Sequence, residues 1–162
     1  MYKNINIFTD GSCIYNPGPG GCAAILQYNK YEKILTQGFF LTTNNRMELM
    51  ASIIAFESLK ESCNICISTD SRYLKEGITK WIYNWKKFNW IRNKKKIVKN
   101  IDLWKRLDLV LLKHNVNWNW IKGHSYHKMN NECDKLARIS AKNPISNDLG
   151  YTKIKKNNYF NI

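Results

Sequence analysis

The chain has 162 residues, of which 44% are hydrophobic, and its 26 lysines and arginines against 12 aspartates and glutamates give a formal net charge of +14. This length favours a single domain with a sizeable core, and the charge favours a polyanionic partner such as nucleic acid. The sequence has no long uncharged apolar stretch and no basic-then-apolar start, so we expect no transmembrane helix, no signal peptide, no membrane contact and a cytoplasmic protein. The odd number of cysteines, five, argues against a disulfide framework.

The first predicted strand, residues 5–12, ends in a carboxylate, a glycine and a hydroxyl. Ile5 and Ile7 alternate with polar neighbours, as in a half-buried strand. Asp10 therefore lies on a strand that we expect to be central, where a carboxylate is costly to bury unless it is paired or binds a metal ion. The rest of the chain must supply the partner of this carboxylate.

The middle of the chain predicts a sheet with one crossover. The predicted elements are strands over 22–28 and 33–41, a helix after Asn45 that extends towards Lys60, a strand over 65–69 and a helical stretch to about Lys80. Short polar connections favour antiparallel pairing of the first three strands. The strand–helix–strand order favours a right-handed parallel crossover, and the helix is expected to bury one broad apolar face.

The segment from residue 80 to residue 99 differs in composition from the rest. Three tryptophans are interleaved with seven basic residues: Trp81, Trp85 and Trp90, with Lys86, Lys87, Arg92, Lys94, Lys95, Lys96 and Lys99. A lysine run is usually a solvated helix face, and each tryptophan alone is more often packed than bound to a ligand. Interleaved aromatic and basic residues are what stacking beside phosphates requires, so we favour a nucleic-acid-binding protrusion.

The last third of the chain completes the predicted fold. It contains a helix capped by Asn100, a strand over 116–121, a loop over 122–127 and a helix that ends near residue 142. The sequence thus predicts an α/β fold: a mixed five-stranded sheet flanked by helices, with the first three strands antiparallel and the last two parallel to the first. We expect one domain over 1–151, with the protrusion at 80–99, and a basic, flexible tail over 152–162.

Three of four candidate site carboxylates have ordinary explanations when each is considered alone. Glu48 follows Asn45 at capping-box spacing. Asp70 can open the helix after its strand, and Asp134 can pair with Arg138 one turn later. The carboxylate on the first strand has no such explanation.

Considered together, the four carboxylates indicate a metal site. Asp10 and Asp70 end strands that we expect to be parallel neighbours, and functional groups gather at the carboxyl ends of such strands. Glu48 lies early in the intervening helix and Asp134 early in the last helix, so all four can converge at one edge. Clustered carboxylates need cations to stay ionised, and oxygen ligands suit Mg²⁺ or Mn²⁺. Two such ions roughly 3.5–4 Å apart can clamp a phosphodiester, activating a water on one side and stabilising the leaving oxygen on the other.

Six short motifs, in this order and spacing, resemble those of a bacterial type 1 ribonuclease H. They are Thr9-Asp10-Gly11-Ser12, Asn16-Pro17-Gly18, Thr43-Asn44-Asn45-Arg46-Met47-Glu48-Leu49, Thr69-Asp70-Ser71, Lys122-Gly123-His124 and Cys133-Asp134-Lys135-Leu136-Ala137. The similarity runs from Met1 to about Tyr151, and the ordered set is far more specific than any one motif. It implies a ribonuclease H-like fold and a monomeric endonuclease that cleaves the RNA strand of RNA/DNA hybrids. It also implies two Mg²⁺ ions per site, with Mn²⁺ as a substitute, and products with 5′-phosphate and 3′-hydroxyl ends.

The resemblance assigns catalytic roles by position. Asp10, Glu48, Asp70 and Asp134 resemble the family's metal-binding quartet, in which Asp10 is expected to bridge both ions. His124, in a loop next to a glycine, resembles the family's mobile histidine, which assists proton transfer or product release. A free-solution histidine pKa near neutrality suits that task.

The resemblance also assigns residues to substrate binding. Asn16, Asn44 and Asn45 resemble residues that read the minor groove of the hybrid, where 2′-hydroxyls distinguish RNA from DNA. Thr43 and Asn100 resemble a pocket for a phosphate of the DNA strand. The basic protrusion resembles the family's handle, and the residues expected to bind there are Trp81, Trp85, Lys86, Lys87, Trp90, Lys95, Lys96 and Lys99.

The chain departs from the family pattern at four positions without losing a metal ligand. Leu41 stands where relatives often carry an arginine for the DNA phosphate. Arg72 replaces a common glutamine beside Asp70, and we expect it to bind substrate by adding phosphate affinity. Tyr126 replaces a glycine in the histidine loop, and Asn131 replaces a glutamate near the site.

The main alternative function is a catalytically weak hybrid-binding module of the same fold, which should lack at least one carboxylate. A resolvase or transposase core should lack the 44–48 motif and the basic protrusion. A non-enzymatic basic scaffold does not explain Asp10 on a central strand. The nuclease reading therefore accounts for more of the sequence than any of these.

Overall fold

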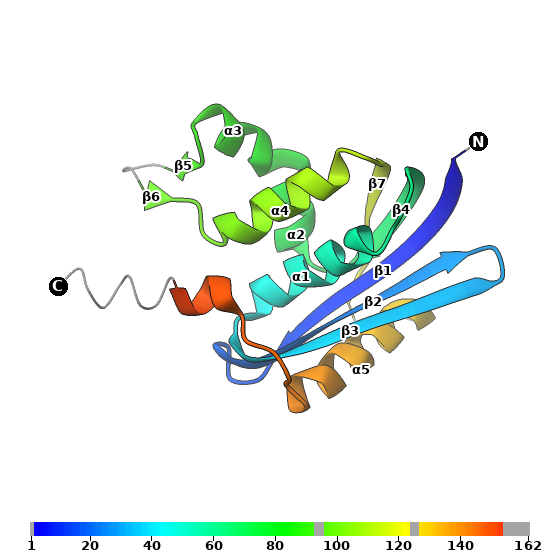
Figure 1. Ribbon diagram of the computed structural model, residues 1–162, viewed down its shortest axis with the longest axis horizontal. Helices are drawn as coiled ribbons and strands as arrows, with labels where there is room; N and C mark the ends of the chain where they lie inside the picture. The colour runs from blue at the N-terminus through cyan, green and yellow to red at the C-terminus, as the bar shows by residue number, and fades with distance from the viewer. Residues whose placement is uncertain (1, 93–95, 124–126, 154–162) are drawn as a thin grey trace.

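The computed structural model describes residues 2–92, 96–123 and 127–153. A five-stranded sheet lies between helices on both of its faces, and a small hairpin projects beside α3 (Figure 1). The elements in chain order are β1 (Lys3–Cys13), β2 (Gly18–Tyr28), β3 (Tyr31–Thr42), α1 (Asn44–Glu57), β4 (Cys63–Thr69), α2 (Arg72–Glu76), the π-helix η1 (Gly77–Trp81), α3 (Ile82–Lys87), β5 (Ile91–Arg92), β6 (Lys96–Ile97), α4 (Ile101–Leu111), β7 (Asn115–Trp120) and α5 (Lys128–Lys142). A short helix follows over 149–153.

The sheet confirms the predicted topology. Its strand order is β3-β2-β1-β4-β7. β1 pairs antiparallel with β2, and β2 pairs antiparallel with β3, whereas β4 is parallel to both β1 and β7. The register places Thr9 opposite Thr69. Asp10 and Asp70, which follow these two threonines, are therefore neighbours, with Asp10 still within β1 and Asp70 just past the end of β4.

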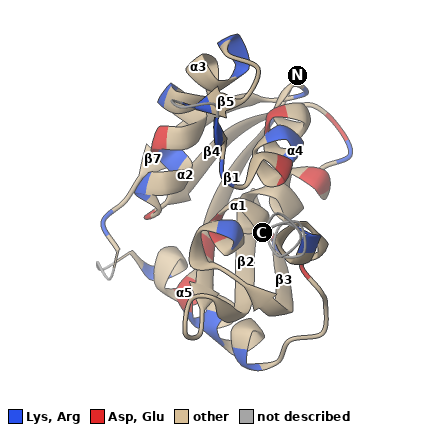
Figure 2. Cartoon of the chain, turned by 90° about the vertical axis from the view of Figure 1, so that its left-hand side faces the viewer, with Lys and Arg blue, Asp and Glu red and all other residues tan. Residues whose placement is uncertain are grey.

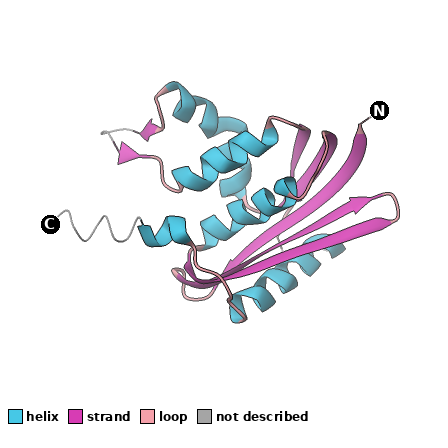
Figure 3. Cartoon of the chain, viewed as in Figure 1, coloured by secondary structure: helices cyan, strands magenta, loops and turns pink. Residues whose placement is uncertain are grey.

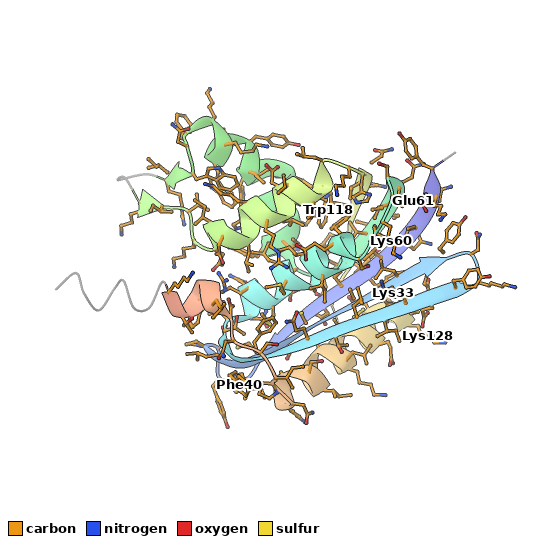
Figure 4. The ribbon with its side chains drawn as sticks, in the orientation of Figure 1. Lys33, Phe40, Lys60, Glu61, Trp118 and Lys128 are labelled. Atoms are coloured by element: carbon orange, nitrogen blue, oxygen red, sulfur yellow. The ribbon has the colours of Figure 1, made fainter. Side chains whose placement is uncertain are left out.

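The two faces of the sheet are covered by different helices. α5 packs on one face against β1, β2 and β3, whereas α1 and α4 lie on the other, as the cyan helices in Figure 3 show. On the α1 side, Phe56 contacts the ring of Trp118 on β7, with ring centroids 6.1 Å apart; Figure 4 labels this tryptophan. The apolar side chains of the sheet and of α1 thus form one continuous core.

Burial of α1 differs from the sequence-based expectation of a single apolar face. Ten of its residues are buried, and these include Arg46, Glu48 and Ser52. The helix is enclosed because it lies between the sheet and α4. Polar side chains on its second face must therefore find partners inside the protein.

Several predicted boundaries shift, and the shifts change how local side chains are read. β2 begins at Gly18, four residues before the predicted start at residue 22. α1 begins at Asn44 with Thr43 as its N-cap, so Glu48 is not at the capping-box position. Ser71, and not the preceding aspartate, caps α2 by accepting a hydrogen bond from a backbone N–H. Helix capping therefore explains neither Glu48 nor Asp70.

Asn100 occupies the N-cap position of α4 as predicted, but its side chain makes no capping hydrogen bond. Its backbone is in the left-handed region, with φ of 58°, which asparagine tolerates better than most residues. The amide instead donates from Nδ2 to the hydroxyl oxygen of Tyr73, at 3.0 Å. The expected capping role is therefore wrong, because a longer-range partner takes the side chain.

The protrusion does not begin with a break in the helix near residue 80, where the sequence analysis expected the helical stretch to end. The helical path continues from α2 through η1 and α3, and the chain then forms the antiparallel hairpin β5–β6, which the sequence analysis did not predict. The rings of Trp85 and Trp104 pack with centroids 5.2 Å apart. A Cβ on Gly77 would lie 2.1 Å from the Trp104 ring, so this glycine lets the indole approach the helix. The protrusion is thereby fastened to α4.

The C-terminal segment after α5 returns to the sheet. The N–H of Phe40 donates to the Ser146 carbonyl oxygen at 2.9 Å, which attaches the segment to the outer edge of β3. Asp148 is buried and lies against α1. Thr152, expected in the flexible tail, belongs to the short helix and donates to the Asp148 carbonyl oxygen. The remaining tail, 154–162, lies outside the described residues.

All five cysteines are free thiols. Cys22, Cys63 and Cys133 are buried, and burial raises the pKa of the Cys22 and Cys133 thiols to about 12. None of the helices in the described ranges combines the length and the apolar character needed to cross a membrane.

Candidate active site

Three carboxylates from different elements meet at the edge of the sheet. Asp10 extends from β1, Asp70 follows β4 directly, and Glu48 projects from α1. Carboxylate oxygens of the three lie within 4.8 Å of one another. The parallel register of β1 and β4 accounts for the first two, because Asp10 and Asp70 directly follow the paired residues Thr9 and Thr69 at the carboxyl end of β4.

Close approach of α1 to β1 delivers the third carboxylate. A Cβ on Gly11 would lie only 2.4 Å from the backbone nitrogen of Glu48. Glycine is thus the residue that allows the helix to pass directly over the strand. The N–H of Gly11 also donates to Asp10 Oδ1 at 2.8 Å, which orients that carboxylate.

The electrostatics of this cluster resist ionisation in the absence of a cation. Burial raises the pKa of Asp10 to about 7, and the neighbouring charge of Asp70 adds to the effect. Burial also raises the pKa of Glu48 well above its usual range, with Asp10 as the next contributor. Although the protein as a whole is strongly basic, it concentrates carboxylates at this site. Basic residues lie elsewhere, for example around α3 and β5, where Figure 2 shows them in blue.

The donor set fits a divalent cation. Oε2 of Glu48 is buried and has no hydrogen-bond partner in the described part of the chain. A buried carboxylate oxygen without a donor is costly, and a metal ion is the partner that a group of oxygen ligands accepts. The three carboxylates therefore suit Mg²⁺ or Mn²⁺ better than a softer metal.

Asp134 lies at the same place but in a different state. It lines a polar cavity of about 340 Å³ together with Asp10, Glu48 and Asp70. Its Oδ1 also accepts from Arg138 Nε at 2.8 Å, so the expected ion pair within α5 is present. The side chain thus faces the cavity while an arginine neutralises it, and it stands outside the tight group of three.

Asp70 has an aromatic neighbour, Trp120, and a basic neighbour, Arg72. Trp120, at the end of β7, donates from its indole Nε1 to the Asp70 carbonyl oxygen at 2.9 Å. The guanidinium of Arg72 lies over that indole, 4.8 Å from the ring centroid. Arg72, expected to bind phosphate, is therefore held by a cation–π contact on the flank of the acidic site.

The residues assigned to the minor groove and the DNA phosphate form adjoining cavities. Asn16, Thr43, Asn45 and Asn100 line one cavity of about 400 Å³. Asn44 instead lines the acidic cavity. Its backbone N–H donates to the side-chain oxygen of Asn16 at 3.0 Å, so the two predicted groove residues are linked.

A third cavity connects this region to the protrusion. Asn45 and Asn100 also line a space of about 320 Å³ whose other walls include Trp81 and Trp85. Lys99 borders both of these cavities and a further one of about 560 Å³ on the hairpin, which Lys96 also lines. Amides, indoles and lysines predicted from distant motifs thus form one surface.

The remaining protrusion residues are not equivalent. Lys86 pairs with Asp108 of α4, with 2.7 Å between Nζ and Oδ2, so its charge is already neutralised. Lys87 is exposed. Trp90 packs against Trp85 inside the protrusion, with ring centroids 6.4 Å apart, as a packed tryptophan would. His124, Tyr126 and Lys95 lie outside the described residues.

Sequence reasoning missed a buried ionic network behind this surface. Arg46, only 1% exposed, donates from Nε to Asp148 at 2.6 Å and from both Nη atoms to Asp102, at 2.8 and 2.6 Å. Its Nη1 also reaches Asn100 Oδ1 at 3.4 Å. Arg46 stands inside a motif, yet nothing in the sequence signals that partners 56 and 102 residues away share it.

Sequence reasoning also missed Asn130 and Tyr151. Asn130 lines the acidic cavity and is 1% exposed. Tyr151 lines the same cavity as Thr43 and Asn100. A buried asparagine early in a polar helix has no periodicity that marks it, and the tyrosine lies beyond the last predicted helix, so neither had a usable signal.

Comparisons with known proteins agree with this geometry. The model of the RNase H family matches residues 2–142. The ribonuclease H of Enterobacter sp. (strain 638) is 59% identical over 151 residues, which cover 93% of this chain and 97% of the relative. The crystal structure of LC9-RNase H1, a type 1 RNase H with the type 2 active-site motif, superposes with a TM-score of 0.82 at 28% identity, covering 90% of this chain and 75% of that chain. LC11-RNase H1 in complex with an RNA/DNA hybrid has the same fold, with a TM-score of 0.62 at 18% identity, covering 86% of this chain and 97% of that chain.

Proposed function

Because the chain belongs to the ribonuclease H family, whose members are metal-dependent nucleases, we propose which of its residues carry out the hydrolysis of the RNA strand of RNA/DNA hybrids. The observation that carries the proposal is the meeting of Asp10, Glu48 and Asp70, with carboxylate oxygens within 4.8 Å of one another. Asp134, on the rim of the same cavity, completes the set. These four side chains would hold the catalytic metal ions.

Mg²⁺ is the ion that the donor set favours, with Mn²⁺ as a substitute, because all candidate ligands are hard oxygens. When bound, two such ions activate a water for attack and stabilise the leaving oxygen, which accounts for 5′-phosphate and 3′-hydroxyl products. The raised pKa values of Asp10 and Glu48 favour their protonated forms, so a cation competes with protons for these two carboxylates. Arg138 must also share Asp134 with the incoming cation.

Substrate selection belongs to the cavities beside the acids. The amides of Asn16, Asn44 and Asn45 can donate to and accept from 2′-hydroxyls, which only the RNA strand carries. Thr43 and Asn100 are the candidates to hold a phosphate of the DNA strand. They line a cavity of about 400 Å³ that Lys99 also lines. The indoles of Trp81 and Trp85 extend this surface as a platform for sugars.

His124 remains the candidate for proton transfer or product release. Its loop follows β7, whose last residue, Trp120, is bonded to the backbone of Asp70. The connection places the start of the loop beside the acidic cavity. The resemblance to the family also implies a cytoplasmic monomer, and the monomeric state is open to measurement by light scattering.

Strand-resolved cleavage tests the proposed function. The protein is incubated with an RNA/DNA hybrid labelled on the RNA strand, with duplex RNA and duplex DNA alongside, in Mg²⁺ and in chelator. We expect metal-dependent cleavage of the RNA strand in the hybrid alone. Tight hybrid binding without cleavage would instead identify a catalytically weak binding module of the same fold.

The lysines of the protrusion give a separate prediction. Replacing Lys87, Lys96 and Lys99 with glutamine should raise KM about tenfold and leave kcat within twofold, because the lysines contact phosphate in ground and transition states alike. The slope of log KM against log salt should fall by about two to three. Steady-state kinetics at several salt concentrations measure both quantities.

Lys86 provides the matched comparison within the same helix. Lys86→Gln should change KM less than Lys87→Gln, because the Lys86 ammonium is already paired with Asp108. Lys30→Gln, at the β2–β3 turn, serves as the control for loss of a distant charge. A fall in kcat with KM unchanged in the triple variant would mean that the protrusion does not act by binding.

A further inference from the structure

Asn130 is the buried polar residue that the proposed mechanism leaves unused. It lies in the first turn of α5, where His127 caps the helix by accepting from the Asn130 N–H through Nδ1 at 3.4 Å. Its side chain is 1% exposed and lines the cavity that holds the catalytic carboxylates. Nδ2 donates to Asp70 Oδ2 at 3.3 Å. The amide thus touches one of the proposed metal ligands directly.

The orientation of this amide follows from its partner. An ionised carboxylate only accepts hydrogen bonds, so the NH₂ group of Asn130 must face Asp70 and its carbonyl oxygen must face away. That oxygen is buried and has no hydrogen-bond partner among the described residues. An unsatisfied buried acceptor costs about 1–3 kcal/mol, so its retention in a polar cavity points to a donor that enters with a ligand.

A neutral amide is also the side chain that this cavity can accommodate. Asp10 and Glu48 already have raised pKa values because acids are crowded there. A further carboxylate would add repulsion, whereas the amide supplies a donor to Asp70 without adding charge. Asp134 lies one helical turn further along α5, so the same helix face presents both groups.

We propose that Asn130 is a positioning residue of the metal centre, which fixes the Asp70 carboxylate through Nδ2 and accepts through Oδ1 a hydrogen bond from a hydration water of the bound divalent cation. The inference rests on the proposed function, because it requires a metal ion in the acidic cavity. Outer partners of this kind orient ligands and raise metal affinity, and their loss typically lowers it 10–100-fold. Asn130 itself acts through Asp70 and the water, and not on the phosphodiester.

The test compares Asn130→Ala with Ala141→Gly. Ala141 is buried on the same helix, eleven residues away from position 130 and outside the cavity, so glycine there weakens α5 without touching the site. Mn²⁺ is titrated calorimetrically into each protein in the absence of nucleic acid. We expect Asn130→Ala to raise the Mn²⁺ Kd about tenfold and Ala141→Gly to leave it unchanged. Hybrid affinity in chelator should be unchanged in both.

The dependence of the cleavage rate on Mg²⁺ concentration tests whether Asn130 positions Asp70 or binds the metal ion directly. If Asn130 positions Asp70, raising Mg²⁺ should restore kcat of Asn130→Ala towards the wild-type value, with a half-saturating concentration about tenfold higher. The serine hydroxyl of Asn130→Ser both donates and accepts, so the half-saturating Mg²⁺ concentration of this variant should lie between those of the wild type and of Asn130→Ala. Asn130→Ser supplies the measurement if the alanine variant does not fold.

Two outcomes would overturn the proposal. A Mn²⁺ Kd for the Asn130 variants within twofold of that of Ala141→Gly would show a structural role only. A lower Mn²⁺ stoichiometry with no recovery of kcat at any Mg²⁺ concentration would make Asn130 a direct ligand. Failure of the wild-type protein to cleave the hybrid would overturn the proposed function instead, and the Mn²⁺ titration distinguishes the two failures.

Discussion

Replacing Asp10 with asparagine is expected to abolish cleavage of the hybrid's RNA strand while hybrid binding persists. The side chain is one of the three converging carboxylates, so loss of its charge weakens the capture of the metal ions that they would hold. Asn16 and Asn45, assigned to the minor groove, and Asn100, assigned to the DNA phosphate, line separate cavities and are untouched. We expect a fall in kcat of three orders of magnitude or more, measured by single-turnover cleavage, with the hybrid Kd in chelator within twofold of wild type.

The same substitution should stabilise the metal-free protein. The pKa of Asp10 is raised from 3.8 to about 7 in the folded state, so folding is favoured below pH 4 and loses stability as pH rises from about 4 to about 7. Each pH unit over which the two states differ by one proton changes stability by about 1.4 kcal/mol. An asparagine carries no proton to lose, so the penalty disappears. We expect Tm of Asp10→Asn in chelator at pH 8 to exceed that of wild type by about 5 °C or more.

Glu61→Gln is the matched control for removal of one carboxylate. Glu61 is exposed and pairs with Lys3 at the opposite end of β1, so its loss should change neither cleavage nor Tm appreciably. Thermal melts at pH 5 and pH 8 test the sign, because the Tm advantage of Asp10→Asn should be larger at pH 8. Unchanged turnover in Asp10→Asn would exclude a metal site that depends on Asp10.

Replacing Arg46 with alanine should be the most destabilising single change in the described structure away from the apolar core. Arg46 is 1% exposed and joins Asp148 and Asp102 through charge-assisted hydrogen bonds. Its removal leaves the carboxylate of Asp148, 3% exposed, with Thr42 Oγ1 and the Tyr151 N–H as its remaining donors among the described residues. Breaking a buried pair in this way costs about 3–5 kcal/mol. Tm should fall by about 10 °C.

Arg106→Ala provides the comparison, because Arg106 pairs with Glu57 on the surface with both side chains more than a third exposed. Surface pairs contribute about 0–1 kcal/mol, so its Tm should change by 3 °C at most. Arg46→Ala should also release the segment that Asp148 anchors, so limited proteolysis after Pro144 should become faster in that variant alone. Equal Tm shifts in the two variants would mean that the buried network contributes little.

The sheet topology was predictable because its signals are local. Alternation of Ile5 and Ile7 with polar neighbours, the turn residues after position 15 and the strand–helix–strand order each act over a few residues. The structure confirms the mixed five-stranded sheet that they predict, with the first three strands antiparallel and the last two parallel to the first. Boundaries were less accurate, since Thr43 and not Asn45 caps α1, and two threonines and two asparagines in a row offer several equivalent caps.

The candidate site divides in the same way. The four carboxylates were identified from their positions at the ends of predicted elements, and the structure places Asp10, Glu48 and Asp70 together with Asp134 in one cavity. The state of each side chain was not predictable. Lys86 is neutralised by Asp108 and Asn100 is taken by Tyr73, and these pairings depend on how α4 packs against α1, α2 and α3.

By itself, the sequence determined the fold class, the relative directions of the strands and the four candidate acids, because hydrophobic periodicity, turn chemistry and carboxylates at strand ends are signals that extend over only a few residues. Only the tertiary structure decided that Arg46 bridges Asp102 and Asp148, and that Asn130 donates to Asp70. These partners lie 56 to 102 residues apart, and burial of a polar group leaves no periodic mark in a sequence. Their pairing follows from the cost of leaving a buried charge or amide unsatisfied, which exists only once the layers have packed.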